Sequence, residues 1–302
     1  MISYDGLYEK LRQAGITKTN LTTIGISSRT IAKIAKGNKL SRKTMLKIAN
    51  YLGCDVDTLY REISSNTILQ ILRDEKEAKI SGGLYHELQI RMAYNSNHIE
   101  GSKLTKEQTR MIFETHTLDI GDDVPVDDIL ETVHHFRAID YLIDVAEEKL
   151  TEEIIKHIHF ILKHDTKDAM LSWFAVGDYK RRANLVGGLE TTKPKDVPAR
   201  MKELLLAYNS KSTVTVNDII AFHADFEYIH PFQDGNGRVG RLIVLKECLR
   251  HNIIPFIIED RKKLFYYRGL SKWKTEKGWL TDTCLDGQDT FIKLLDIFGI
   301  PH

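Results

Sequence analysis

The chain has little cysteine and no long hydrophobic segment. Its three cysteines, in 302 residues, are widely spaced and odd in number, at Cys54, Cys248 and Cys284. This pattern argues against both a disulfide framework and a Cys-x-x-Cys metal site. No apolar run approaches the roughly eighteen residues of a membrane span, and the first fifteen residues include Asp5 and Glu9 and lack an apolar core. We therefore expect a protein of the reducing cytoplasm, without an export signal or a membrane segment.

The net charge of +1 conceals an uneven distribution. Residues 1–63 hold eleven Lys and Arg against five Asp and Glu, a balance of +6, whereas the rest holds thirty-two against thirty-seven, a balance of −5. A basic module joined to a larger, mildly acidic one suggests contact with nucleic acid, because Lys and Arg that neutralise phosphates release counterions on binding. A solvated basic face would have the same composition. The length and the 42% hydrophobic content fit one small and one full-sized globular domain.

Residues 230–241, with the sequence HPFQDGNGRVGR, concentrate groups suited to phosphate chemistry. The apolar spacing on either side predicts one helix over 216–228 and a second that begins at 235–237 and runs to about Arg250. The start of a helix presents unpaired N–H groups and the positive end of the helix dipole, and glycine lets an anion approach the backbone closely. The turn is therefore suited to binding a phosphate.

The side chains of this segment add to that prediction. Arg238 and Arg241 are three residues apart on one helix face and can each donate two hydrogen bonds to phosphate oxygens. Asp234 would repel a phosphate unless a hard cation such as Mg²⁺ lay between them, so it is the candidate metal ligand. His230 is the one group of the segment that titrates near neutrality, which makes it the candidate general base. The segment is not a Walker loop, since no strand precedes it and no Gly-Lys-Ser/Thr follows.

These twelve residues match, at every defined position, the signature His-x-Phe-x-Asp/Glu-Gly-Asn-Gly-Arg-x-x-Arg, so the chain resembles the Fic family. The resemblance implies an all-α domain with a short β-hairpin flap, which transfers AMP from ATP to a hydroxyl group of a target protein and releases pyrophosphate. It also implies that His230 is the base and that Asp234 binds Mg²⁺. The residues it assigns to the nucleotide phosphates are Gly235, Asn236, Gly237, Arg238 and, for the γ-phosphate, Arg241.

A second motif, Ser96-Asn97-His98-Ile99-Glu100-Gly101, precedes the signature in the chain. Ser96 and Glu100 are four residues apart and share one face of a predicted helix, which Gly101 can end. Taken alone, they would be a capping or surface pair. The motif resembles the inhibitory helix of the Fic family, Ser/Thr-x-x-x-Glu-Gly/Asn, which implies that Glu100 binds Arg241 in the place of the ATP γ-phosphate. A carboxylate and a phosphate do compete for the same guanidinium group.

Residues 176–194 interrupt the helical pattern and have the composition of a strand, a turn and a strand, which predicts a short hairpin. By resemblance, this hairpin is the flap that holds a target segment through main-chain pairing. The part expected to face the target consists of Leu185, Val186, Gly187 and Gly188.

Aromatic residues elsewhere in the helical body have more than one interpretation. Tyr266 and Tyr267 lie on a predicted helix and are either core aromatics or, by resemblance to the family, an aromatic wall against the adenine. Four histidines of the body are taken as core or surface residues, because no Cys or acid stands at ligand spacing. These are His134, His135, His157 and His159.

Residues 1–63 predict short helices separated by glycines. One ends at Gly15, a second spans 17–24, and a third begins at the N-cap Ser27 and ends by Gly37. Further helices are expected over 41–52 and from 56 to about 63. The segment resembles the helix-turn-helix domain of the Xre/Cro repressor family, which implies that the third helix enters the major groove of DNA. The expected DNA contacts are Ser28, Arg29, Thr30 and Lys33. Protein contact or dimer formation through the same fold is the alternative.

Together these observations predict a helix-turn-helix domain over 1–63, a solvated linker helix within 64–83 and a Fic domain over 84–295. The predicted function is protein adenylyl transfer, with ATP and Mg²⁺, to a Ser, Thr or Tyr hydroxyl of a target that can be the chain itself, restrained by Glu100. One alternative is removal of AMP, with Glu100 orienting a water molecule. Another is a nucleotide-sensing transcriptional regulator that binds DNA, for which a homodimer is compatible. The intact Gly-Asn-Gly turn argues against the kinase-type variation of the family.

Overall fold

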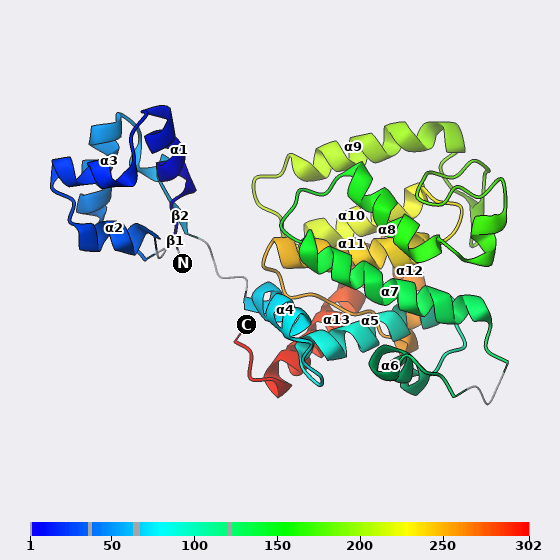
Figure 1. Cartoon of the computed structure of the whole chain (residues 1–302). Helices are drawn as coiled ribbons and strands as arrows, with labels where there is room; N and C mark the ends of the chain where they lie inside the picture. Colours follow the sequence, from blue (N-terminus) through cyan, green and yellow to red (C-terminus); the bar gives the residue numbers. More distant parts are fainter. Residues whose placement is uncertain (1, 36–37, 63–66, 120–122, 302) are drawn as a thin grey trace. The chain divides into compact units, whose positions relative to one another are not determined.

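The computed structural model describes residues 2–35, 38–62, 67–119 and 123–301, and it divides into two compact units, residues 1–66 and 67–302. Both units are built almost entirely of helices (Figure 1). Within the described residues, the strands form two antiparallel two-stranded pairs. The predicted all-α fold class with one short hairpin in the larger unit is therefore confirmed. Among the helices of the described ranges, none is long and apolar enough to cross a membrane.

The smaller unit packs its helical segments around one apolar core. Their bounds are α1 (Asp5–Gln13), the 3₁₀ helix η1 (Lys18–Ile24), α2 (Ser28–Ala35) and α3 (Arg42–Leu52). The core includes the fully buried Leu7, Leu21 and Ile48. Ser41 caps α3 by accepting a hydrogen bond from the Thr44 N–H, and Gly53 ends it with a φ of 61°, a conformation that favours glycine. This is the succession of helix, turn and helix that the glycine spacing predicted, although the segment 18–24 is a 3₁₀ helix.

The helix predicted over residues 56–63 is wrong. Within its described part, a single 3₁₀ turn η2 (Val56–Thr58) is followed by the strand β2 (Arg61–Glu62), which pairs with β1 (Ile2–Ser3). Asp55 starts the turn by accepting from the Asp57 N–H. The chain then extends because the backbone groups of β2 find partners in a strand almost sixty residues away. A local apolar pattern carries no signal of such a pairing.

The larger unit begins with α4 (Thr67–Ala78) and α5 (Leu84–Ile99). Ile68, Leu69 and Leu72 of α4 are buried in the main core of this unit. On the charged face, Arg73 binds Glu147 and Lys76 binds Asp144, at and just after the end of α7 (Val126–Asp144). The helix over 67–78 is therefore part of the larger unit, whereas its charge run had suggested a solvated connection. These two cations are therefore paired within the larger unit.

The rest of the larger unit surrounds one central helix, α11. The further elements are α6 (Lys106–Thr115), α7 (Val126–Asp144), α8 (Glu152–Lys163), β3 (Leu185–Val186), β4 (Leu189–Glu190), α9 (Val197–Asn209), α10 (Val216–Ile229), α11 (Asn236–Arg250), α12 (Lys263–Lys272) and α13 (Gly278–Ile297). Nearly every residue of α11 from Val239 to Leu249 is buried, and the helix packs against α5, α7, α8 and α10 (Figure 1). A helix buried on all sides is fixed in place. Its N-terminus is therefore a rigid point of the fold.

Candidate active site

The loop between α10 and α11 is closed by hydrogen bonds of its own residues. His230 ends α10 with a φ of 50°, and Gly235 begins α11 with a φ of 78°. The left-handed conformation costs a non-glycine residue about 1–2 kcal/mol. Asn236 offsets this cost, because its buried side chain accepts from the Phe232 N–H at 2.8 Å and donates to the Phe232 carbonyl at 2.9 Å. The Asn236 side chain therefore shapes the loop, which leaves its backbone N–H at the start of the helix.

His230 lies at the end of α10 with only 16% of its side chain exposed. Burial, assisted by the nearby Lys180 ammonium, lowers the pKa of His230 to about 4. The carboxyl group of Glu227, one turn earlier, has an oxygen 3.9 Å from His230 Nδ1, and burial raises the pKa of Glu227 to about 8. The imidazole is therefore neutral at pH 7 and can accept a proton, as a general base must.

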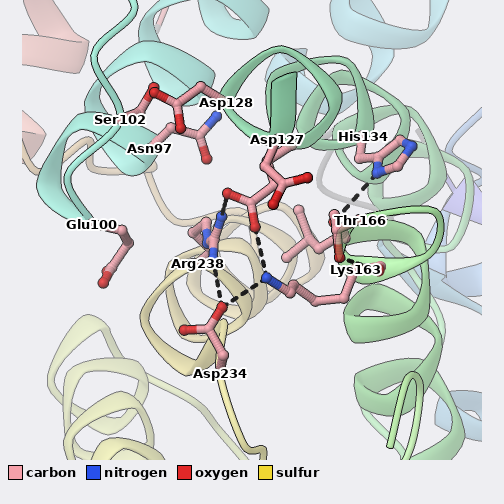
Figure 2. Close-up of polar contacts among 12 residues, drawn as sticks. Asn97, Glu100, Ser102, Asp127, Asp128, His134, Lys163, Thr166, Asp234 and Arg238 are labelled. Atoms are coloured by element: carbon pink, nitrogen blue, oxygen red, sulfur yellow. Dashed lines mark hydrogen bonds and ion pairs between the residues drawn. The ribbon is translucent and has the colours of Figure 1, made fainter. Parts of the chain in front are cut away.

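Asp234 is held by two cations. Its Oδ2 accepts from Lys163 Nζ at 2.8 Å and from Arg238 at 3.1 Å (Figure 2). Arg238 is itself buried and also forms an ion pair with Glu131. Although burial alone would raise it, Arg238 and Lys163 hold the pKa of Asp234 well below its usual range. Half of the Asp234 side chain is exposed, so an ionised carboxylate faces solvent beside the start of α11.

Arg241 joins the signature to the motif that contains Ser96 and Glu100. Its NH2 donates to Glu100 Oε1 at 2.7 Å and to the Ser96 carbonyl at 2.9 Å, and its Nε donates to Ser96 Oγ at 3.0 Å. The predicted ion pair of Glu100 with Arg241 is therefore present. A β-carbon added at Gly237 would overlap Glu100 Oε1, which places this carboxylate directly against the first turn of α11. Glu100 thus lies on the surface where a phosphate would approach the helix.

The two tyrosines of α12 have different surroundings. Tyr266 is fully buried, and its hydroxyl lies 2.8 Å from His223 Nε2 and accepts from Arg241 at 3.4 Å. Tyr267 is 39% exposed and donates to the Ile99 carbonyl at the end of α5. Tyr266 thus supports Arg241 from the core. Of the pair, Tyr267 alone is exposed enough to contact a ligand.

His159 holds the backbone of Asp234, the candidate metal ligand. The sequence did not predict this contact. Its Nδ1 accepts from the Gly177 N–H at 3.0 Å, so the other ring nitrogen, Nε2, carries the proton and donates to the Asp234 carbonyl at 3.2 Å. Its ring is stacked on Phe232 at 4.0 Å. Burial lowers the pKa of His159 to about 3, so this arrangement persists at neutral pH. His159 is one of the histidines taken as core residues, and nothing in the sequence indicated its contact with residue 234.

The predicted hairpin is present and exposed. Leu185 pairs with Glu190 and Val186 with Leu189, through a turn at Gly187 and Gly188 in which both φ angles are positive. Leu185 and Val186 are 65% and 47% exposed. An open cavity of about 450 Å³ adjoins the hairpin and is lined in part by Asn184, Leu185, Glu190 and Thr191. The hairpin thus offers apolar side chains to a partner.

Lys180 ties this hairpin to the signature loop. Its buried ammonium donates to Asn184 at 2.8 Å and to Thr191 at 2.6 Å, and Asn184 in turn donates to the Phe232 carbonyl at 3.3 Å. Burial lowers the pKa of Lys180 to about 8. The hairpin base is therefore joined by hydrogen bonds to the signature loop at Phe232, so a segment docked on the hairpin lies at a defined position relative to that loop.

The four residues predicted to contact DNA all lie on α2 of the smaller unit. Ser28, Arg29 and Lys33 are exposed, and Arg29 and Lys33 are four residues apart, hence on one face of the helix. Thr30 is half-buried, and its hydroxyl pairs with Ser27 at 2.9 Å at the start of the helix. The helix therefore presents two cations to solvent, as a phosphate or base contact requires.

The chain matches known proteins over both units. Residues 149–247 match the Fic/DOC family, and residues 7–59 match a helix-turn-helix family. The protein adenylyltransferase Fic of Drosophila melanogaster is 29% identical over 181 residues, 59% of this chain and 36% of the fly protein. That of Aedes aegypti is 28% identical over 208 residues, 67% of this chain and 38% of the mosquito protein. The chain thus spans little more than a third of the length of these relatives.

Solved structures share the fold. A Fic domain containing signaling protein from Bacteroides thetaiotaomicron superposes with a TM-score of 0.59 at 23% identity, over 76% of this chain and 95% of that one. Fic-1 from C. elegans superposes with a TM-score of 0.58 at 20% identity, over 84% of this chain and 80% of that one. At these identities the likeness shows the fold alone. The family matches therefore identify a Fic/DOC domain that includes residues 149–247 and a helix-turn-helix domain over residues 7–59.

Proposed function

We propose that the chain is a protein adenylyltransferase that transfers AMP from ATP to a hydroxyl group of a protein. The observation that carries the proposal is the order of groups around one helix N-terminus. A neutral His230 precedes it, an ionised Asp234 flanks it, and the buried Arg241 donates to the Glu100 carboxylate beside it. The relatives named protein adenylyltransferase Fic support the same reaction.

ATP would bind with its phosphates at the start of α11. The N–H groups of residues 235–237 and the helix dipole favour the negative charge there, and Arg241 would take the γ-phosphate. Arg238 already binds Glu131 and Asp234, so it would contribute mainly its charge to the α- and β-phosphates. Asp234 is a hard, ionised and half-exposed oxygen ligand, which suits Mg²⁺. When bound there, Mg²⁺ would neutralise charge on the phosphate oxygens.

His230 would act as the base in this reaction. It would remove the proton from a Ser, Thr or Tyr hydroxyl of the target, whose oxygen then attacks the α-phosphorus. The bond from the α-phosphorus to the bridging oxygen breaks, and pyrophosphate leaves with the electron pair. Leu185, Val186, Gly187 and Gly188 would position the target segment by main-chain pairing with the hairpin. This mode of binding fixes the hydroxyl while allowing several targets, the chain itself included.

Mass spectrometry of the chain incubated with ATP and a cell lysate tests this proposal. We expect AMP in phosphodiester linkage on Ser, Thr or Tyr of a protein, and none with His230→Ala. His157→Ala is the matched control, because His157 is an exposed histidine of α8. Equal modification by His230→Ala and His157→Ala would contradict the assignment of the base.

Glu100 would hold the enzyme in an inhibited state. Its carboxylate occupies the Arg241 guanidinium and the space beside Gly237, both of which the γ-phosphate would need. Removal of AMP is the alternative reaction, since the Glu100 side chain is 30% exposed and could orient a water molecule. Release of AMP from a modified target on incubation with the chain, lost in Glu100→Gly, would favour this alternative.

We further propose that the smaller unit binds DNA through α2. The exposed Arg29 and Lys33 and the match to a helix-turn-helix family support this function. Footprinting on the DNA upstream of the chain's own coding region, with and without ATP, would test both binding and its dependence on nucleotide. Protection unchanged by Arg29→Ala with Lys33→Ala would contradict the assignment of these contacts.

A further inference from the structure

Lys163, the last residue of α8, is a buried cation surrounded by carboxylates. Its side chain is 3% exposed, and its Nζ lies 2.7 Å from Glu131 Oε1 and 3.0 Å from Asp168 Oδ2. The third carboxylate oxygen, Asp234 Oδ2, lies 2.8 Å from Nζ (Figure 2). An ammonium group has three N–H donors, and all three are used here. Two of these carboxylates come from segments 32 and 71 residues away along the chain.

The arrangement of oxygens around Nζ is that of a cation site. Three carboxylates from three segments converge on one point, and without a positive charge at that point they would repel one another strongly. Divalent cations take carboxylate oxygens at about 2.0–2.6 Å, so small side-chain movements would convert this geometry into a set of metal ligands. Arg238 does not fill this role, because it binds Glu131 and Asp234 from another side and does not contact Asp168.

We propose that Lys163 is a built-in cation that positions Asp234 and keeps a divalent metal out of this three-carboxylate site. Lys163 and Arg238 both bind Oδ2 of Asp234, and Figure 2 shows the other carboxylate oxygen pointing away from both cations. That oxygen is the one left for a metal on the nucleotide side. Lys163 is thus a positioning residue, and its importance for AMP transfer rests on the function proposed above.

The variants that test this proposal differ in the net charge around the position of Lys163 Nζ. Two cations, Lys163 and Arg238, face three carboxylates, which is a net charge of −1. Lys163→Met keeps the length of the stem and leaves a net charge of −2 around an empty central position. Lys163→Met with Asp168→Asn restores −1 and removes one ligand. Lys167→Met is the matched control, because Lys167 lies four residues on, is 80% exposed and pairs with Asp127 at 3.7 Å.

We would measure Mn²⁺ binding without nucleotide, both by electron paramagnetic resonance and by the shift in Tm. We expect Lys163→Met to bind Mn²⁺ roughly tenfold more tightly than the parent, or better, because a unit charge has been removed from within about 3 Å of the site. Its Tm should rise with Mn²⁺, whereas the parent, Lys167→Met and the double variant should show neither change. This readout needs no ATP and no target, so it is independent of whether AMP transfer occurs.

Two results would overturn the proposal. One is parental Mn²⁺ affinity in a folded Lys163→Met, and the other is equal Mn²⁺ affinity in the single and the double variant. If Lys163→Met folds only with Mn²⁺ present, the proposal is supported. If it stays unfolded with Mn²⁺ while the double variant folds, the three carboxylates do not form a metal site and the proposal fails.

Discussion

Replacing Glu100 tests whether the ion pair with Arg241 restrains the site. Arg241 is 4% exposed and binds the Glu100 carboxylate at 2.7 Å, while Glu100 itself is 30% exposed. A charge-assisted hydrogen bond of this kind contributes about 1.5–3 kcal/mol, and the exposure of Glu100 favours the lower end. ATP must overcome that energy to reach Arg241. Since about 1.4 kcal/mol is a factor of ten, we expect Glu100→Gly to raise ATP affinity and kcat/KM for AMP transfer roughly tenfold to thirtyfold.

Two further variants separate charge from volume and from general effects on α5. Ser96 keeps two hydrogen bonds to Arg241 in every variant of Glu100, so the guanidinium stays in position. Glu100→Gln removes the charge but still fills the space beside Gly237, and should recover only part of the gain. Glu87→Gln is the control, because Glu87 also lies on α5 but forms ion pairs with Arg91 of α5 and Arg110 of α6, away from the signature.

Calorimetric titration with ATP and initial rates of AMP transfer measure these effects. If the ion pair restrains the site, ATP affinity and the rate of AMP transfer in Glu100→Gly should be well above those of Glu100→Gln. In Glu87→Gln both should equal those of the parent. The contrary result is ATP affinity and AMP-transfer rates of Glu100→Gly within about twofold of those of Glu87→Gln over a range of Mg²⁺ concentrations. The ion pair would then have a structural role only, and the inhibitory role proposed for Glu100 would be wrong.

Three further changes probe the loop and the core. Gly237→Ala should weaken ATP binding even though its methyl group displaces Glu100, because that methyl group also covers the start of α11, and calorimetry would detect this. Asn236→Ala should destabilise the chain by about 1–3 kcal/mol in urea unfolding, since two backbone groups of Phe232 lose their buried partners. Burial lowers the pKa of His135 in the folded chain to about 3. As pH drops below about 6.5, His135 therefore takes up a proton in the unfolded chain and not in the folded one, so the free energy of unfolding falls. His135→Gln should reduce that slope by about 1.4 kcal/mol per pH unit, and an unchanged slope would exclude this source.

The sequence predicted those parts of the site whose spacing is local. The segment 230–241 contains the end of one helix, a loop and the start of another, so its residues determine the backbone that carries them. Ser96 and Glu100 are one helical turn apart, and the structure places both on Arg241. The hairpin at Gly187 and Gly188 follows from turn composition. In each case the information lies within a few neighbouring residues.

The parts that were missed depend on contacts between distant segments. Lys163 stands at the end of an amphipathic helix, where a lysine ordinarily faces water and interacts with the helix dipole. Its burial arises because α7 and the loop at Asp234 close over it, and residue spacing carries no sign of that. His159 and Glu131 were missed for the same reason. The strand at residues 61–62 was missed because its partner lies at the other end of the smaller unit.

The charged face of α4 was predicted to meet solvent, whereas two of its residues bind another segment. Arg73 and Lys76 looked like a solvated face, yet they bind Glu147 and Asp144 while Ile68 and Leu72 enter the core. Apolar spacing predicted the buried stripe correctly, but composition alone does not show whether a charged face meets water or another helix. The assignment of this helix to the larger unit needed the three-dimensional structure.

The central claim is that His230 promotes transfer of the AMP group of ATP to a protein hydroxyl. It is tested most directly by incubating Glu100→Gly, with and without His230→Ala, with ATP that carries an isotope on either the α- or the γ-phosphate. The account predicts protein labelling from α-labelled ATP only, and its loss when His230 is replaced. Labelling from γ-labelled ATP, or labelling from α-labelled ATP that persists without His230, would contradict it.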